Sequence, residues 1–365
     1  MATLPIVTYP KKILKQKAEE VLNITSQIKS LIPQMIETMY ENEGIGLAAP
    51  QVGISKRIII VETSDNPRAA VKQEKSKPFR GKPLAFLNPT ILKKSGKPVT
   101  EEEGCLSLPG IFVQVKRSAK IALTCQTPEG KEVKIEAGGL IARIFQHEID
   151  HLQGKLILDH LSPLLAHLKE QGILQSPQII RAFSAINRED FVPPDMKGWA
   201  HLDEVLPLPS GQTISQPYVV AFMLEKLEPK EGQKILDIGS GSGWTTALLA
   251  SLVGQKGKVI GIEVLPELKE FGERNVSKYN FVKQGVAEFI CKNGNEGHAR
   301  EAPYDGILVS ASLPSKELPS AWKEQLKIGG KIVVPIQHSI WVFAKEDENH
   351  FARKEYPGFA FVPFI

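Results

Sequence analysis

The sequence predicts two domains, an α+β domain followed by an α/β domain built on a parallel sheet. The chain has 365 residues, and at roughly 150 residues per domain this length suggests two to three domains. Up to about residue 165, short strands of alternating polarity lead into one long helix, a combination typical of α+β domains. From about residue 177, apolar strands alternate with helices, which indicates a parallel sheet covered by helices.

The composition is that of a globular protein. Hydrophobic residues make up 42% and charged residues 24% of the chain, which excludes collagen-like and disordered proteins. No apolar run approaches the ~20 residues of a membrane span, and the first residues lack the basic and apolar segments of a secretory signal. Three cysteines cannot form a disulfide framework and indicate a reducing compartment. We therefore expect a cytoplasmic protein with no membrane partner.

The net charge of +4 is distributed unevenly. Residues 1–165 hold 23 basic and 17 acidic side chains, a net of +6, and residues 166–365 hold 22 and 24, a net of −2. Neither half has the dense clustering of lysine and arginine that nucleic-acid binding requires. Charge therefore gives no reason to expect a nucleic-acid partner.

One early helix, several short strands and a final long helix are predicted for the first domain. The elements are a helix over residues 26–40, strands over 57–61, 84–87, 121–126 and 131–136, and a helix over 138–153. Gly154 follows this last helix, where a glycine commonly caps a helix C-terminus. The hydrophilic and basic stretch 64–82 is predicted to be an exposed loop between two strands.

The second domain is predicted to alternate strands with helices after a first helix over residues 177–186. The strands are 234–238, 258–262, one near 281–283, 305–309 and 331–336, and the helices between them are 244–253 and 266–278. A hydrophilic segment, 166–176, precedes this pattern. The predicted domains are therefore 1–165 and 177–365, joined by a linker over 166–176.

Two histidines in the last helix of the first domain are spaced to share a metal ion. His147 and His151 lie four residues apart, so on a helix they occupy one face. They continue the apolar stripe of Leu140 and Ile144, which must point inward, and burying two imidazoles without a ligand would be costly. Glu148 is placed to take a proton from metal-bound water, as in H-E-x-x-H hydrolases.

A catalytic metal site also needs a third protein ligand and an open position. Cys105, on a loop beside a glycine, is the candidate, and its thiolate suits Zn²⁺ or Fe²⁺. Gly44 and Gly46 allow close approach of a ligand to the backbone, and Gln51 can donate an amide hydrogen to a developing oxyanion. The alternatives are that His147 and His151 are merely packed or that they form an inert zinc site, but a closed site would want a fourth cysteine or histidine and would leave Glu148 without a role.

Three segments, 44–51, 103–107 and 146–154, together resemble in order and spacing the sequence motifs of peptide deformylases. The resemblance covers about residues 4–165 and implies an α+β metallohydrolase. It implies hydrolytic removal of the formyl group from the N-terminal formylmethionine of nascent polypeptides. Nascent chains would then be the partners, and no nucleic acid is expected beyond proximity to the ribosome.

The same resemblance implies roles for individual residues: metal ligand, general acid/base, oxyanion donor and substrate contact. Cys105, His147 and His151 would bind the metal, and Glu148 would be the general acid/base. Gln51 and the backbone N–H of Leu106 would donate to the oxyanion, and Gly46 would contact the substrate. The metal that it implies is Fe²⁺, with Zn²⁺ or Ni²⁺ able to replace it. Metal-activated hydroxide suits the task, because a bound ion can lower the pKa of its water to about 7.

A glycine-rich turn follows the first predicted strand of the second domain. The apolar strand 234–238 runs through Gly239, Gly241 and Gly243 into a helix, which is the context of a nucleotide-binding loop. Glu263, twenty residues after Gly243, ends the next strand and is placed to bind ribose hydroxyls. The pattern Asp-x-Gly-x-Gly-x-Gly differs from the dinucleotide motif and resembles the first motif of S-adenosylmethionine-dependent methyltransferases.

Segments 188–194, 206–221, 305–311 and 361–364 resemble signatures of protein-L-isoaspartate O-methyltransferases. The resemblance covers about residues 177–365. It implies a Rossmann-like α/β fold, S-adenosylmethionine as cofactor, and methyl transfer to the α-carboxyl group of L-isoaspartyl residues in damaged polypeptides.

This resemblance also implies site residues. Ser215 matches the active-site serine, Glu263 binds the cofactor ribose, and the remaining cofactor contacts are Asp237, Gly239, Gly241 and Gly243. The substrate carboxylate is already ionised at pH 7 and needs no general base. Catalysis then depends on positioning, and Ser215 can hydrogen-bond the carboxylate.

One position departs from the methyltransferase pattern. Relatives carry glycine and aspartate after the strand predicted near residues 281–283, in contact with the cofactor, whereas this chain has Gly285 and Val286. Weaker cofactor binding is the hypothesis that follows.

The sequence favours a bifunctional enzyme. The alternatives are a non-catalytic C-terminal module that binds polypeptides, or a methyltransferase acting on another substrate such as RNA.

Overall fold

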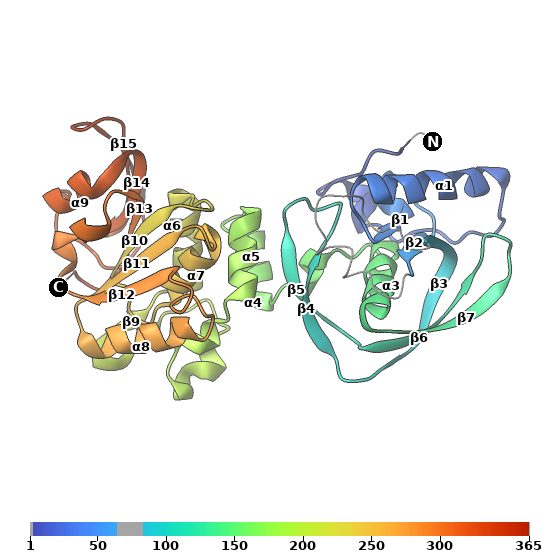
Figure 1. The fold of residues 1–365 in the computed structure, drawn as a ribbon, viewed down its shortest axis with the longest axis horizontal. Coiled ribbons are helices and arrows are strands. Elements are labelled where there is room, and N and C mark those ends of the chain that lie inside the picture. Colours follow the sequence, from blue (N-terminus) through green and yellow to red (C-terminus); the bar gives the residue numbers. More distant parts are fainter. Residues whose placement is uncertain (1–2, 64–82, 365) are drawn as a thin grey trace. The chain divides into compact units, whose positions relative to one another are not determined.

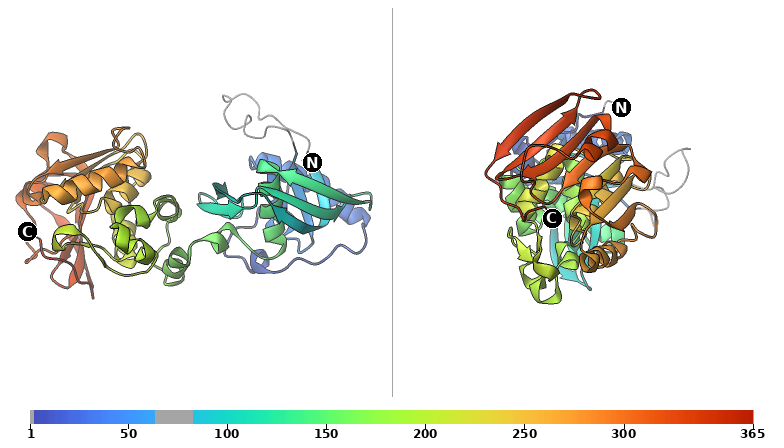
Figure 2. Two further views of the ribbon diagram at one scale, coloured as in Figure 1. Left: turned by 90° about the horizontal axis from the view of Figure 1, so that it is seen from below. Right: turned by 90° about the vertical axis from the view of Figure 1, so that its left-hand side faces the viewer.

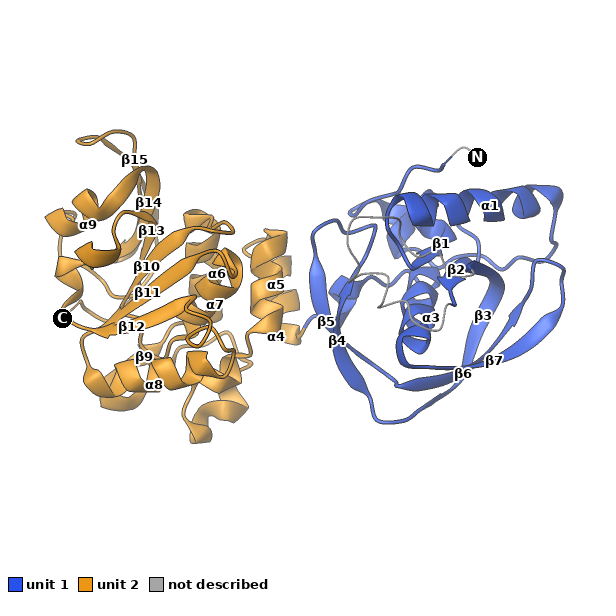
Figure 3. Ribbon diagram, in the orientation of Figure 1, with its two compact units in different colours: residues 1–161 blue, residues 162–365 orange. Residues whose placement is uncertain are grey.

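The computed structural model describes residues 3–63 and 83–364. The chain forms two compact units, Met1–Leu161 and Ser162–Ile365 (Figure 3). The exposed loop predicted over residues 64–82 lies outside the described residues. None of the described helices is both long enough and apolar enough to cross a membrane.

The first unit is an α+β structure, as predicted. Its described helices and strands are α1 (Ser26–Glu41), β1 (Gly46–Ala48), β2 (Ile58–Glu62), β3 (Pro83–Ser95), β4 (Val99–Gly104), β5 (Phe112–Arg117), β6 (Lys120–Gln126), β7 (Glu132–Gly138) and α3 (Gly139–Leu152). Gly154 follows α3 with a positive φ of 72°. A Cβ atom there would lie 2.5 Å from a backbone oxygen, so only glycine fits.

The main sheet of the first unit is buried on both faces at β2, all of whose residues are buried. Its strand order is β1-β2-β3-β6-β7, with every neighbouring pair antiparallel. Because alternate residues of a strand point to opposite faces, Ile59 of β2 packs in one core cluster with Ile144 of α3. Its neighbour Ile58 packs in the other cluster with Met35 of α1. The inward stripe of α3 is therefore held against the sheet, while β4 and β5 pair separately (Figure 1).

The second unit is the predicted α/β structure. Its described helices are α4 (Pro163–Glu170), α5 (Pro177–Ala185), α6 (Pro217–Leu227), α7 (Trp244–Val253), α8 (Pro266–Ser277) and α9 (Ser320–Gln325). Its strands are β8 (Leu206–Pro207), β9 (Thr213–Ile214), β10 (Lys234–Ile238), β11 (Lys258–Glu263), β12 (Ala287–Cys291), β13 (Tyr304–Val309), β14 (Leu326–Ile336), β15 (Ser339–Lys345) and β16 (Phe351–Pro357).

A seven-stranded sheet forms the centre of the second unit, in the order β12-β11-β10-β13-β14-β15-β16. The pairs from β12 to β14 are parallel. Strands β15 and β16 extend one edge in antiparallel fashion, coloured red in the right-hand view of Figure 2. The chain runs outward from β10 to β12 and then returns to the other side of β10 with β13. Such a reversal marks the place, at the carboxyl ends of the strands, where open α/β sheets bind ligands.

The structure places the start of the second unit a few residues before the predicted boundary. Helix α4 lies in this unit, so residue 165 falls inside a helix. The predicted linker 166–176 contains the second half of α4 and the turn that leads to α5.

The strand predicted near residues 281–283 is wrong. These residues form a turn, and the strand is β12, which begins at Ala287. Val286 is 2% exposed and precedes β12, so it lies at the amino end of a parallel sheet whose ligand side is the carboxyl end. Lys292 and Asn293 follow β12 at that carboxyl end. Val286 therefore gives no reason to expect weak cofactor binding.

Candidate active sites

The three predicted metal ligands of the first unit lie together. Cys105 follows β4, while His147 and His151 lie on α3, and one donor atom from each falls within 4.8 Å of the others. Sγ of Cys105 is 3.2 Å from Nε2 of His151. Metal–sulfur bonds of about 2.3 Å and metal–nitrogen bonds of about 2.0 Å fit one ion among these atoms. The set of one thiolate and two imidazoles suits Zn²⁺ or Fe²⁺ better than Mg²⁺ or Ca²⁺.

The charge on Cys105 suits the same role. Burial alone would raise the pKa of its thiol, but the imidazoles of His151 and His147 lower the pKa to about 5. The thiolate is the form that binds metal ions. By contrast, burial raises the pKa of the Cys125 thiol to about 11, and Cys125 lies in the core of the unit.

A carboxylate orients one of the histidines. Oε2 of Glu103 lies 3.0 Å from Nδ1 of His147, which leaves Nε2 of that ring for a metal. Two arginines hold Glu103 in turn. Arg117 donates to both of its carboxylate oxygens, at 3.0 and 2.9 Å, and Arg143 donates to Oε1 at 2.6 Å. Burial alone would raise the pKa of Glu103, but His147 and Arg117 lower it, so the carboxylate stays ionised.

Sequence reasoning gave no role to this ion-pair network. Glu103 was part of a recognised motif, but nothing in the sequence pairs it with Arg117 on β5 or with Arg143 on α3. Arg117 also donates to Asp150 at 2.5 Å, and Asp150 lies 2.8 Å from Nε2 of His160. The available signal was the alternation of β5, which puts Arg117 on the same face as Val113 and Val115, because a charged side chain on an apolar face is rarely buried unless paired.

Glu148 lines the same cavity as Cys105 and His147 and is 3% exposed. Burial raises the pKa of its carboxyl group to about 7, against the lowering effect of the two histidines. Such a pKa suits a group that accepts and returns a proton near neutral pH. Gly46 leaves room for it, because a Cβ atom there would lie 2.3 Å from Oε1 of Glu148.

The predicted oxyanion donors also line this cavity. Gln51 is 1% exposed, its Oε1 accepts the N–H of Ala48 at 2.8 Å, and its Nε2 lies 3.6 Å from Sγ of Cys105. The bond to Ala48 fixes the orientation of the amide and aims its donor at the site. Leu106 lines the cavity next to Cys105. The structure thus brings together every residue that the sequence predicted for this site.

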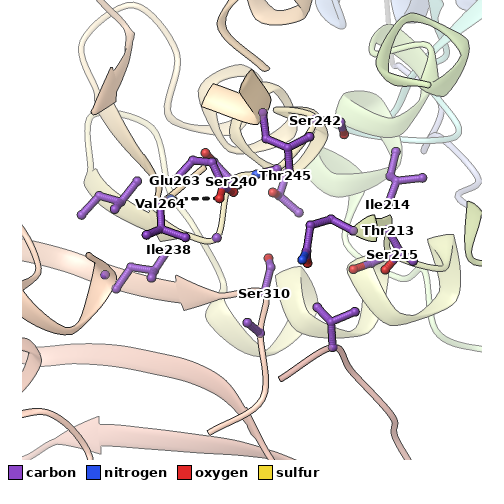
Figure 4. Close-up of a pocket in the computed structure, with 18 of the residues that line it drawn as sticks. Thr213, Ile214, Ser215, Ile238, Ser240, Ser242, Thr245, Glu263, Val264 and Ser310 are labelled. Atoms are coloured by element: carbon purple, nitrogen blue, oxygen red, sulfur yellow. Dashed lines mark hydrogen bonds between the residues drawn. The ribbon is translucent and has the colours of Figure 1, made fainter. Parts of the chain in front are cut away.

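The second unit has its own cavity at the carboxyl ends of the central strands. Gly239 and Gly241 line it after β10, Glu263 lines it after β11, and Ser215 lines it from the segment that precedes α6. Figure 4 shows Glu263 and Ser215 on different sides of the cavity.

Glu263 is tied to the glycine loop. Its Oε2 accepts the backbone N–H of Gly241 at 2.9 Å, and its Oε1 accepts the N–H groups of Val264 and Leu265 at 2.9 and 3.1 Å. The side chain is 6% exposed. A carboxylate fixed in this way at the cavity edge is placed to bind hydroxyl groups of a ligand.

Asp237 and Gly243 support the loop from behind and are not among the residues that line the cavity. Asp237 is fully buried, and its Oδ2 accepts hydrogen bonds from Thr245 and Thr246 at 3.0 and 2.6 Å. Burial raises the pKa of Asp237 to about 6. Gly243 has a φ of 83°, and a Cβ atom there would lie 2.8 Å from the backbone oxygen of Gly272 in α8. It allows the loop to pack against α8.

Comparison with known families divides the chain in the same way. Residues 3–167 match the family model "Polypeptide deformylase", and residues 160–365 match the model "Protein-L-isoaspartate(D-aspartate) O-methyltransferase (PCMT)". The peptide deformylase of Thermodesulfovibrio yellowstonii is 47% identical over 168 residues, which are 46% of this chain and 94% of that protein.

The second half has equally clear relatives. The protein-L-isoaspartate O-methyltransferase of Thermococcus onnurineus is 43% identical over 203 residues, which are 54% of this chain and 90% of that protein. A Plasmodium falciparum protein-L-isoaspartate O-methyltransferase, solved in complex with S-adenosyl-L-homocysteine, shares the fold at a TM-score of 0.51 and 24% identity. That match covers 56% of this chain and 97% of that one.

Proposed function

The chain belongs to the peptide deformylase family in its first half and to the protein-L-isoaspartate O-methyltransferase family in its second half, and from this premise we propose the residues and substrates through which this bifunctional enzyme acts. The first half removes the formyl group from N-terminal formylmethionine of nascent polypeptides. The second half methylates L-isoaspartyl residues of damaged polypeptides for repair. Three cysteines without disulfides support a reducing compartment, and we place the enzyme in the cytoplasm.

In the deformylase half, Cys105, His147 and His151 hold a divalent metal, Fe²⁺ with Zn²⁺ or Ni²⁺ as replacements. Such an ion would lower the pKa of a bound water molecule and polarise the formyl oxygen. Glu148 accepts the proton of the attacking water and returns it to the leaving amine, which its pKa of about 7 permits. Gln51 donates its amide N–H to the developing oxyanion, as does the backbone N–H of Leu106.

In the methyltransferase half, S-adenosylmethionine would occupy the cavity beside the glycine loop. Glu263 binds its ribose hydroxyls, while Gly239 and Gly241 let it approach the backbone. The isoaspartyl carboxylate is ionised at neutral pH and needs no general base to accept the methyl group. The methyl–sulfur bond of the cofactor would break as the methyl–oxygen bond forms, leaving S-adenosylhomocysteine. Ser215 donates a hydrogen bond to this carboxylate and so aligns it with the methyl group. The Plasmodium falciparum relative was solved with S-adenosyl-L-homocysteine, which is the cofactor without its methyl group, and this supports S-adenosylmethionine as the cofactor.

The clustering of three donor atoms within 4.8 Å carries the deformylase proposal. The test combines metal analysis with deformylation of a formylmethionyl peptide by the wild type and Glu148→Ala. The variant is expected to retain its metal and to lose activity by at least about 100-fold, because a general base contributes 10²–10⁴-fold. A chain that binds no divalent ion, or a Glu148→Ala variant with full activity, would contradict the proposed mechanism.

The methyltransferase proposal is tested with methyl-labelled cofactor. An isoaspartyl peptide is expected to take up label, and the peptide of the same sequence with ordinary aspartate is not. Cofactor binding without methylation of the isoaspartyl peptide would favour a non-catalytic module. Transfer of label to RNA instead would favour an RNA methyltransferase.

A further inference from the structure

Arg188 is a buried cation whose hydrogen-bond partners are backbone carbonyl groups. It begins the short 3-10 helix Arg188–Phe191 and is 5% exposed. Its guanidinium donates to four carbonyl oxygens, those of Ala200, Leu202, Glu204 and Ser215, at 3.2, 3.1, 2.8 and 3.1 Å. Burial lowers the pKa of Arg188 to about 10, so it stays charged at neutral pH.

One nitrogen of Arg188 joins two chain segments beside the cavity. Its Nη2 donates to the carbonyl of Glu204 and also to that of Ser215. These two residues flank the small ribbon β8–β9, in which Leu206 pairs with Ile214. Arg188 therefore holds the two strands of the ribbon together at their open end, next to Ser215, which lines the cavity.

The other face of the guanidinium contacts the helix that follows the glycine loop. The central carbon of the Arg188 guanidinium lies 5.1 Å from the ring centre of Trp244, within the range of a cation–π contact. Trp244 is the first residue of α7 and lines the cavity, as Ser215 does. Arg188 thus joins the Ser215 segment to the cofactor side of the cavity.

Asp203 fixes the same segment through two further hydrogen bonds. Its Oδ1 accepts the backbone N–H of Tyr218 at 2.7 Å, and its Oδ2 lies 3.2 Å from Nε2 of Gln216. The backbone of Ser215 therefore lies between two anchors, a guanidinium on its own carbonyl and a carboxylate on the residues that follow.

We propose that Arg188 is a positioning residue for methyl transfer, setting the place of Ser215 relative to the cofactor through the Ser215 carbonyl and the Trp244 ring. The inference rests on the proposed methyltransferase function and assigns Arg188 no contact with substrate. Burying a charged side chain among carbonyl groups costs free energy of folding. A role in positioning the reacting groups would explain why this position carries an arginine. A displacement of about 1 Å can cost a reaction of this kind about 100-fold.

The test uses the full chain with Arg188→Met and Arg188→Lys. We expect Arg188→Met to lower kcat/KM for an isoaspartyl peptide by about 100-fold, and Arg188→Lys to lower it by about 10-fold, because lysine keeps the charge and loses the fork geometry. The dissociation constant for S-adenosylmethionine, measured by calorimetry, should stay within about 3-fold in both. Equal loss of cofactor affinity and methylation would overturn the inference.

A double-mutant cycle with Ser215→Ala isolates the route of the effect. If Arg188 acts through Ser215, then Arg188→Lys should lower kcat/KM only slightly in the Ser215→Ala background, since the effects of mutations at coupled residues are not additive. Additive losses would contradict the proposal. The conservative Arg188→Lys variant keeps the cycle usable if Arg188→Met does not fold.

Lys345 offers a matched control for a merely structural effect. It is also a buried cation, 3% exposed, and its Nζ donates to the carbonyls of Lys323 and Leu326 at 2.9 and 3.0 Å. It also forms an ion pair with the exposed Glu348 at 3.3 Å. It is not among the residues that line the cavity. Lys345→Met should lower the unfolding midpoint and leave kcat/KM unchanged below that midpoint. A wild type that fails to methylate the peptide refutes the proposed function itself, whereas an active wild type with a fully active Arg188→Met refutes only the role of Arg188.

Discussion

Glu103 and His147 form a carboxylate–imidazole pair, with Oε2 of Glu103 3.0 Å from Nδ1 of His147. The pair joins β4 to α3, so the strand that leads to Cys105 also orients a ligand on the helix. Carboxylates that bond to the far nitrogen of a metal-binding histidine fix its tautomer and ring orientation. In this enzyme Arg117 and Arg143 fix the carboxylate as well.

Replacing this carboxylate is expected to weaken metal binding without removing a ligand. Glu103→Gln keeps the size of the side chain but loses the charge that favours the bond to His147. We expect the dissociation constant for the metal to rise by about 10–100-fold, measured by competition with a chelator. Glu132→Gln, on the exposed strand β7, is the control. Unchanged metal affinity in Glu103→Gln would show that the pair does not orient His147.

Gly46 gives a second prediction, because there is no room for a methyl group between its backbone and Glu148. A Cβ atom at Gly46 would lie 2.3 Å from Oε1 of Glu148 and 2.9 Å from the side chain of Ile144. Gly46→Ala must displace the carboxylate, and we expect kcat/KM for deformylation to fall by about 100-fold or more. Gly138→Ala is the matched control, since its nearest neighbour atom is 3.8 Å away.

The methyltransferase activity of the same chain provides an internal reference for Gly46→Ala. Since Gly46 lies in the other unit, methylation of an isoaspartyl peptide should keep its wild-type rate. Loss of both activities together would indicate general misfolding and not displacement of Glu148.

The deformylase site was predictable because much of it is encoded locally. A helix places His147 and His151 on one face whatever the tertiary structure, and an apolar stripe fixes which face is buried. Cys105 was found by its motif and by elimination. The partners of Glu103 were not predictable, since Arg117 and Arg143 reach it from a different strand and from the helix, and no periodicity relates these positions.

In the second unit, one misplaced strand led to a wrong expectation about cofactor binding. The apolar residues near 281–283 suggested a strand, but the strand that pairs with β11 begins at Ala287. That shift moved the expected cofactor contact onto Val286, which is buried at the opposite end of the strand. Pairing between distant strands decides such a register, and a single sequence carries little information about it.

Asp237 predicts a pH dependence of stability in the second unit. Its pKa is about 6 in the folded state and 3.8 as the reference value, so between these pH values the folded form binds more protons than the unfolded form. The free energy of unfolding should therefore fall as pH rises from about 4 to about 6. Asp237→Asn should remove this loss, which amounts to roughly 2–3 kcal/mol at about 1.4 kcal/mol per pKa unit.

Urea unfolding followed by tryptophan fluorescence can measure this difference in the intact chain. All four tryptophans lie in the second unit, at positions 199, 244, 322 and 341. The informative quantity is the difference between wild type and Asp237→Asn at pH 4.5 and at pH 7. A difference that does not change with pH would contradict a raised pKa for Asp237.

Gly239 and Gly243 separate contact with the cofactor from packing within one loop. Both have similar positive φ angles, 76° and 83°, so alanine at either position brings comparable backbone strain of roughly 1–2 kcal/mol. A Cβ atom at Gly239 would find its nearest neighbour at 3.8 Å, whereas one at Gly243 would meet the Gly272 oxygen at 2.8 Å and a Val276 methyl at 2.9 Å. Overpacking of that kind costs a further 1–3 kcal/mol or so.

Gly243→Ala should therefore lower the free energy of unfolding of the second unit by about 2–5 kcal/mol, clearly more than Gly239→Ala. Cofactor affinity should show the reverse order, because Gly239 lines the cavity and Gly243 does not. Tryptophan-monitored unfolding and calorimetric titration with S-adenosylmethionine measure the two quantities on the same samples. If Gly243→Ala kept full stability but lost cofactor affinity, the glycine would belong to the binding surface and its contact with α8 would be incidental.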